Sequence, residues 1–177
     1  MKRVLIVSGS LLALVAGAAY VSLNVGRWMS APDPLRPVDA IVVPSGDHNR
    51  RLPTALGHVR AGLAPELWVT VERGGPVVDE RAAVRAFAPD ARILGTSRSV
   101  RQDAALVAEH ASGRPTIAVV TSPWTVSRVR ITYERVLGQH ADVLVWSDGS
   151  RYEARRWWRS EPETTAVEAV KLVGTLM

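Results

Sequence analysis

Short apolar segments alternate with segments of helical periodicity from residue 38 to the end of the chain. A strand that is apolar along most of its length is buried on both faces, which is typical of a parallel sheet covered by helices. We therefore predict a three-layer α/β/α Rossmann-like domain with a mostly parallel five-stranded sheet. The predicted strands are 39–43, 67–71, 92–94, 116–121 and 141–146.

The segments between these strands place apolar residues three and four positions apart, which indicates amphipathic helices. Ser99 and Ser160 each precede a Gln or Glu by three residues, which is the spacing of a capping box at a helix start. Ser122 is predicted to cap a helix that opens with Pro123. The predicted helices cover about 52–63, 76–87, 99–111 and 123–136, and a last one begins near Ser160, with an apolar stripe formed by Ala166, Val170 and Val173.

In open parallel sheets, ligands bind at the carboxyl ends of the strands. Three arginines, Arg51, Arg101 and Arg128, fall near predicted helix starts at that edge. Free N–H groups at a helix start favour anions, and a guanidinium group binds phosphate or carboxylate through two hydrogen bonds. Local pairing of each Arg with a nearby Asp or Glu is the competing interpretation. The loops that the strand-end rule selects are 44–51, 72–80, 95–103 and 121–128.

These loops predict one pocket for an anionic, phosphate- or nucleotide-like ligand. A carboxylate could act there as acid or base, and the candidates are Asp47, Glu80 and Asp103. Neighbouring arginines would lower the pKa of such a carboxylate, which favours binding over catalysis. The alternative is an enzyme that acts on a phosphate-bearing metabolite. The predicted ligand-binding residues are Ser45, Gly46, Asp47, Arg51, Ser99, Arg101, Ser122, Thr125 and Arg128.

The sequence predicts no cofactor and no metal site. It lacks the P-loop, the Gly-x-Gly-x-x-Gly fingerprint and the Gly-x-Ser-x-Gly elbow, and its four His residues have no metal-ligand spacing. The absence of Cys excludes disulfides and Cys-ligated zinc. The formal charge of +5, from 22 Lys+Arg against 17 Asp+Glu, comes from scattered arginines, so nucleic acid is not predicted as a partner.

An apolar run from Val4 to about Leu23 follows Lys2 and Arg3. A run of about 20 apolar residues can span a bilayer as a helix, and its positive flank stays in the cytoplasm. We therefore predict a single-pass cell-membrane protein whose domain lies outside the cytoplasm. Secretion is the alternative, because the small-x-small triplet 16–18 has the form of a cleavage site. The predicted organisation is an anchor or signal segment at 1–28, a Pro-rich linker at 29–37 and the α/β domain at 38–177.

Several short motifs resemble the YdcF-like family of envelope proteins, the group that includes SanA and ElyC. The resemblance implies a Rossmann-like fold over about 38–172 and a role in cell-envelope biogenesis, with an envelope precursor or a phosphorylated lipid carrier as the ligand or substrate. At Thr125 the sequence departs from the family pattern, which has His there, and Thr cannot act as a base at neutral pH. The motifs are the opening strand and turn at 38–46, Arg51-Leu52, Ser99-x-Arg101-x-Asp103 in an actinobacterial form, Val120-Thr-Ser122 followed by Arg128, and a closing segment with Trp157-Trp158, Glu168 and Lys171.

Overall fold

The computed structural model describes residues 2–72, 80–113, 115–138 and 140–176. Its centre is a sheet of five parallel strands in the order β3-β2-β1-β4-β5. The predicted fold class is therefore confirmed. The chain leaves the central strand first toward β2 and β3 and later returns to β4 and β5 on its other side. The strands are β1 (Ala40–Val43), β2 (Glu66–Glu72), β3 (Arg92–Ser97), β4 (Thr116–Thr121) and β5 (Asp142–Ser147).

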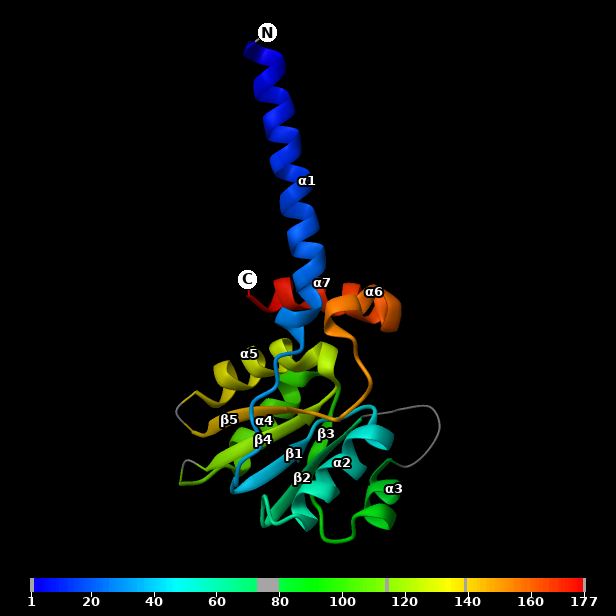
Figure 1. Ribbon diagram of the computed structural model, residues 1–177. Helices are drawn as coiled ribbons and strands as arrows, with labels where there is room; N and C mark the ends of the chain where they lie inside the picture. Colours follow the sequence, from blue (N-terminus) through cyan, green and yellow to red (C-terminus); the bar gives the residue numbers. More distant parts are fainter. Residues whose placement is uncertain (1, 73–79, 114, 139, 177) are drawn as a thin grey trace.

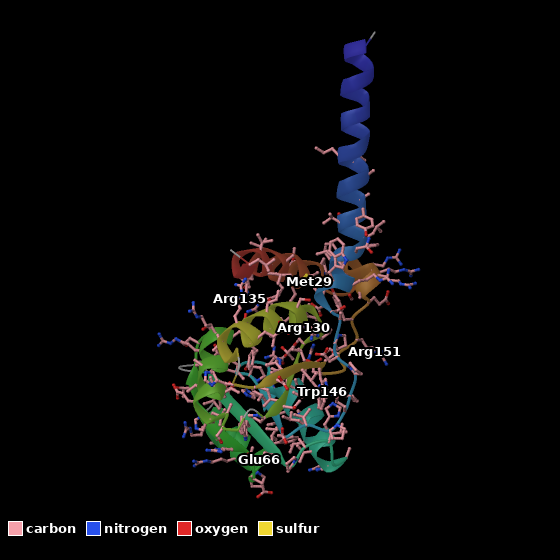
Figure 2. All side chains as sticks on the ribbon, turned by 90° about the vertical axis from the view of Figure 1, so that its left-hand side faces the viewer. Met29, Glu66, Arg130, Arg135, Trp146 and Arg151 are labelled. Atoms are coloured by element: carbon pink, nitrogen blue, oxygen red, sulfur yellow. The ribbon has the colours of Figure 1, made fainter. Side chains whose placement is uncertain are left out.

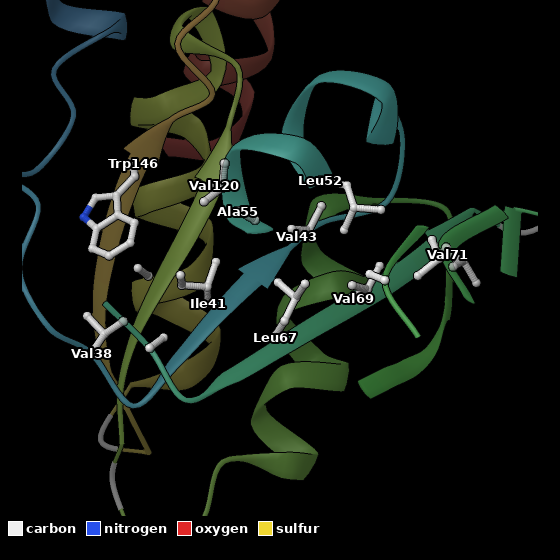
Figure 3. Close-up of a cluster of buried hydrophobic side chains, with 14 residues drawn as sticks. Val38, Ile41, Val43, Leu52, Ala55, Leu67, Val69, Val71, Val120 and Trp146 are labelled. Carbon is white, nitrogen blue, oxygen red and sulfur yellow. The ribbon is translucent and has the colours of Figure 1, made fainter. Parts of the chain in front are cut away.

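Helices cover both faces of the sheet (Figure 1). Because successive side chains of a strand point to opposite faces, β1 sends Ile41 and Val43 toward α2 and α3, and Ala40 and Val42 toward α4 and α5. Figure 3 shows the first of these two core layers. All four residues of β1 are buried, as the apolar pattern predicts for a central parallel strand. The covering helices are α2 (His48–Arg60), α3 (Glu80–Phe87), α4 (Val100–His110) and α5 (Val126–Leu137).

Several element boundaries differ from the sequence-based expectation. The helix predicted at about 52–63 is α2 (His48–Arg60), which begins and ends earlier in the chain. β3 continues three residues beyond the predicted end, because Thr96 and Ser97 pair with the end of β2 although neither is apolar. The predicted start of α3 at residue 76 lies outside the described residues, and the described part of that helix begins at Glu80.

The predicted caps are confirmed only in part. The Ser99 hydroxyl accepts a hydrogen bond from the backbone N–H of Gln102 at 3.3 Å, as predicted. The Gln102 side chain reaches back to the N–H of Arg98 rather than that of Ser99. Ser122 precedes the short 3-10 helix η1 (Pro123–Thr125), but its side chain makes no cap because it donates to Asp148.

The last part of the chain differs more from the prediction. Ser160 does not open the last helix: it ends α6 (Trp157–Ser160), and α7 (Pro162–Leu176) begins two residues later with a proline. The capping box predicted at Ser160 is therefore wrong. The predicted apolar stripe of α7 faces outward, since Val170 is 74% and Val173 is 56% exposed.

The N-terminal helix α1 (Lys2–Met29) extends away from the α/β domain (Figure 1). Within the described part of the chain, hydropathy identifies no helix long and apolar enough to cross a membrane. The foot of α1 is packed on the domain. Met29 is buried, the Trp157 ring N–H donates to the carbonyl of Ser22 at 2.7 Å, and Gly26 lies against the 3-10 helix η2 (Ala154–Arg156).

The Pro-rich linker lies along the edge strand β5. Asp33 donates its N–H to the carbonyl of Val145 at 2.8 Å. One oxygen of the Asp33 carboxylate accepts from the Val145 N–H and from Arg130, both at 2.7 Å. These contacts cover part of an edge whose backbone groups would otherwise face solvent. The linker therefore joins α1 to the domain through specific contacts.

Candidate functional site

The turn after β1 brings polar groups to the carboxyl edge of the sheet. Gly46 has φ +78° and Asp47 has φ +45°, so two consecutive residues in the left-handed region redirect the chain into α2. Glycine adopts this conformation without steric cost, and Asp tolerates it better than most residues. The turn leaves Ser45 pointing toward the ends of β2 and β3, where its backbone N–H donates to the Thr70 hydroxyl at 2.9 Å.

Asp103, from the first turn of α4, collects hydrogen bonds from three strand ends. Oδ1 accepts from the hydroxyls of Thr70 and Ser97, both at 2.5 Å, and Oδ2 accepts from the Ser45 hydroxyl at 3.2 Å. The Ser45 N–H lies 3.4 Å from Oδ1. Asp103 itself is 1% exposed. A carboxylate offers about four acceptor sites, so this cluster uses Asp103 almost completely.

Arg51, from the first turn of α2, ties the same turn to β4. Its Nη1 donates to the carbonyls of Ser45 and Gly46 at 3.3 and 3.1 Å, and its Nη2 donates to the Ser122 hydroxyl at 3.3 Å. Its Nε is buried and has no partner among the described residues. Burial lowers the pKa of Arg51, and the nearby carboxylates, led by Asp47, oppose that shift.

His48 and Glu80 form a pair beside this turn. The ring Nδ1 of His48 is hydrogen-bonded to Glu80 Oε1, and Glu80 Oε2 accepts from the backbone N–H of Glu72. A carboxylate on one ring nitrogen fixes the tautomer that leaves the other as an acceptor. The other nitrogen, Nε2, is buried without a partner among the described residues. The pair therefore presents an oriented imidazole at the edge of the sheet.

The charges around Arg51 disfavour an anion at the strand ends. Asp47, Asp103 and Asp148 all act on the Arg51 guanidinium, and most of its donors already bind protein groups. Asp148 also accepts from the Ser122 hydroxyl at 3.2 Å. A further negative charge would meet three carboxylates around one buried cation, which is an unfavourable arrangement.

A second polar site lies on the α4 and α5 side of the same edge. A groove of about 900 Å³ runs between α4, α5 and α7, and Arg101, Arg128 and Arg135 line it together with the α4 cap residue Ser99. Arg128 Nε donates to Glu168 at 2.6 Å, and Lys171 donates to the other oxygen of that carboxylate at 2.7 Å. Two cations therefore bind one buried carboxylate beside the groove, while Arg135 donates to the backbone carbonyls of Thr175 and Leu176 at the end of α7.

The structure thus separates the predicted ligand-binding residues into two groups. The strand-end cluster contains Ser45, Gly46, Arg51 and Ser122, with Asp47 at the turn and the candidate acid Asp103 at its centre. The groove contains Ser99, Arg101 and Arg128. Thr125 belongs to neither group, because its buried hydroxyl contacts Thr121 and donates to the carbonyl of Ser122, both at 2.8 Å.

Sequence reasoning missed several members of the strand-end cluster. Thr70 and Ser97 lie within strands, where no motif marks a polar residue. Ser97 is the last residue of β3, and Thr70 lies two residues before the end of β2. His48 directly follows the turn, but the sequence contains no motif or metal-ligand spacing that marks it. Asp148 follows β5, so the strand-end rule applied to the fifth strand would have included it. Tyr133 is buried nearby, and burial raises the pKa of its phenol well above the ordinary value, with the Asp103 charge adding to the shift.

Comparison with known proteins adds no family assignment, since neither a protein-family model nor a curated protein matches the chain.

Proposed function

We propose that the protein binds an anionic, phosphate- or nucleotide-like ligand in the groove between α4, α5 and α7. The observation that carries this proposal is that Arg101, Arg128 and Arg135 line one groove, with Arg101 in the first turn of α4. Arg128 binds Glu168 and Arg135 donates to the carbonyls of Thr175 and Leu176, so Arg101 is the cation that the proposal assigns to the ligand first. Guanidinium groups bind phosphate oxygens in pairs, and the first turn of a helix adds free N–H donors and a favourable dipole. The strand-end cluster lacks this excess of positive charge.

The biological setting of the proposal is the cell envelope. The resemblance to YdcF-like envelope proteins supports a role in envelope biogenesis, with an envelope precursor as the natural anion. The Lys2-Arg3 flank and the apolar sequence of α1 support a single-pass membrane protein with an extracytoplasmic domain. Reporter fusions after residue 177 test the topology. A reporter active only in the cytoplasm contradicts it, and a shortened secreted product supports cleavage near 16–18 instead.

Thermal unfolding with inorganic pyrophosphate tests the binding proposal. A ligand that binds only the folded state at about 100 times its Kd stabilises that state by about 2.7 kcal/mol. We expect this stabilisation in the wild type and its loss in Arg101→Ala, because Arg101 is exposed and its removal leaves the core intact. Arg92→Ala is the matched control, since Arg92 is exposed at the opposite, amino edge of the sheet. Equal stabilisation in the wild type and Arg101→Ala contradicts the proposal.

One observation favours an enzyme as the second candidate function. The His48–Glu80 pair follows directly on the turn that carries Ser45, and it leaves the buried Nε2 of His48 without a partner among the described residues. Such an imidazole could accept a proton during attack on a phosphorylated envelope metabolite or lipid carrier. The test is turnover of phosphomonoester and pyrophosphate substrates by the wild type, His48→Gln and Thr125→His. Wild-type turnover that His48→Gln abolishes supports the enzyme. Binding without turnover in any variant supports the first proposal alone.

A further inference from the structure

The last long helix, α7, turns polar residues toward the domain and apolar residues toward solvent, which is the opposite of the usual arrangement on a globular domain. Its buried residues are polar, with Thr165 at 0% and Glu168 at 5% exposure. Its outer residues are large and apolar. They form what we call the α7 face: Val167, Val170, Val173 and Leu176, each more than half exposed. In water this arrangement leaves apolar surface uncovered, whereas an apolar environment on the outer side would make it favourable.

The α7 face looks toward the side from which α1 extends. Glu168 turns inward, where it binds Arg128 of α5, so the opposite side of α7 is directed away from the sheet. Figures 1 and 2, which view the molecule from directions 90° apart, both show α6 and α7 lying across the foot of α1. A plane drawn across the foot of α1 would therefore meet the α7 face.

Basic and aromatic side chains adjoin this face on the same end of the molecule. We call them the Arg–Trp patch: Arg155, Arg156, Trp158 and Arg159, all exposed. No Asp or Glu occurs between residues 154 and 160. The patch is fixed to α1, because Trp157 donates to the carbonyl of Ser22 and Gly26 packs on η2. Its position relative to α1 is thus set by direct contacts.

We propose that the α7 face and the Arg–Trp patch rest on an anionic lipid leaflet beside the foot of α1. This inference rests on the proposed membrane anchor and adds a second membrane contact to it. An amphipathic helix lies in the interface with its apolar face in the lipid, and nearby Arg residues attract anionic headgroups. Trp158 has the amphipathic ring that favours this depth.

The contact orients the domain on the membrane and fixes where its ligand groove lies. The groove is bounded by the other side of α7, through Gly174 and Thr175. With α7 on the leaflet, the groove opens next to the headgroup layer. An anionic envelope precursor that stays in the membrane would reach the groove without leaving the lipid surface.

The absence of Cys allows a direct test on the full chain. Single-Cys variants carry an environment-sensitive fluorophore in nanodiscs that contain phosphatidylglycerol and a spin-labelled lipid quencher. Val170→Cys reports on the α7 face and Leu14→Cys on α1; both side chains are exposed. Glu66→Cys is the control, because Glu66 is exposed at the end of the domain farthest from α7 (Figure 2). We expect quenching and a blue-shifted emission at positions 14 and 170, and neither at position 66.

The outcomes separate this inference from the membrane anchor itself. Quenching at position 14 without quenching at position 170 leaves the anchor intact and overturns the inference. Absence of quenching at both positions overturns both. A blue shift at position 170 without lipid quenching, accompanied by self-quenching between labels, indicates a second copy on the α7 face and also overturns it. With the Arg–Trp patch intact, quenching at position 170 should be stronger in anionic lipid than in neutral lipid. Replacing Arg155, Arg156 and Arg159 by Glu should abolish this difference. Persistence of that difference contradicts the role of the patch.

Discussion

Replacing Asp103 by Ala should destabilise the domain more than any other single change at the carboxyl edge of the sheet. The carboxylate accepts from the hydroxyls of Thr70, Ser97 and Ser45, and the Ser45 N–H also faces it. Each hydrogen bond to a charged acceptor contributes about 1.5–3 kcal/mol, but neighbouring bonds are not additive. Removing one partner of a buried charged network costs about 3–5 kcal/mol, which we take as the expected loss.

Urea unfolding of the wild type and Asp103→Ala measures this loss. With an m-value of about 2 kcal/mol per M, the unfolding midpoint should fall by roughly 1.5–2.5 M. Glu109→Ala is the control, because Glu109 is an exposed acid on the same helix. Its effect should stay within about 0.5 kcal/mol. Asp103→Asn should fall between the two, since the surrounding hydroxyls can turn and donate or accept as required.

A double-mutant cycle with Thr70→Val isolates the central contact. Thr70 is fully buried, and its hydroxyl lies 2.5 Å from Asp103. Thr70→Val should cost less in the Asp103→Ala background than in the wild type, by about 1 kcal/mol or more. If Asp103→Ala costs no more than Glu109→Ala, or if the two changes are additive, the reasoning about this cluster is refuted.

Three further predictions follow from individual contacts. Gly26→Ala should destabilise the protein by about 1–3 kcal/mol, because a Cβ there would lie 2.5 Å from a backbone carbonyl of η2, whereas Gly17→Ala, with open space around it, should not. Tyr133→Phe should leave stability unchanged or raise it at neutral pH, since the buried hydroxyl has no partner among the described residues. The raised pKa of Tyr133 means that the unfolded chain loses the phenol proton at a lower pH than the folded protein does. The wild type should therefore lose stability as pH rises above the ordinary pKa of 10.0, and Tyr133→Phe should not show this loss. Burial lowers the pKa of His58, so the neutral ring contributes fully to folding stability above pH 6.5, and this contribution is lost as pH falls below that value. His58→Phe keeps an aromatic edge on Trp146 and should make the urea unfolding midpoint depend less on pH in that range. If the midpoint depends on pH equally in the variant and the wild type, His58 is not the group responsible.

The fold was predictable because the core strands are apolar on both faces. β1 is buried at all four positions, and such a segment has few alternatives to the centre of a parallel sheet. The end of β3 was not predictable in the same way. Gly95, Thr96 and Ser97 carry no apolar signal, yet they extend the strand because β2 offers backbone partners beside them. Backbone pairing is a tertiary property that a propensity pattern does not contain.

The sequence predicts which edge of the sheet carries the candidate site, but it does not predict which face of the sheet each residue lies on. The strand-end rule correctly brought Ser45 and Ser122 together, because β1 and β4 are neighbours and Arg51 bridges them. It also grouped Arg51 with Arg128, although α2 and α5 cover opposite faces. The rule identifies an edge but does not say on which side of it a helix start will lie. The His48–Glu80 contact joins residues 32 positions apart, and no sequence pattern predicts that these two helix starts lie side by side.

The two polar sites are connected through α4, and this connection gives the strand-end cluster a part in the proposed function. Asp103 and Arg101 are two residues apart in the first turn of α4, so their side chains leave the helix in different directions. Asp103 turns inward and fastens that turn to three strand ends, while Arg101 turns outward and lines the groove. A binding group gains affinity when the element that carries it is held in place before the ligand arrives. If the groove binds an anion as proposed, the internally satisfied carboxylate is a positioning residue for it, because the hydroxyls that bind Asp103 hold the turn that carries Ser99 and Arg101.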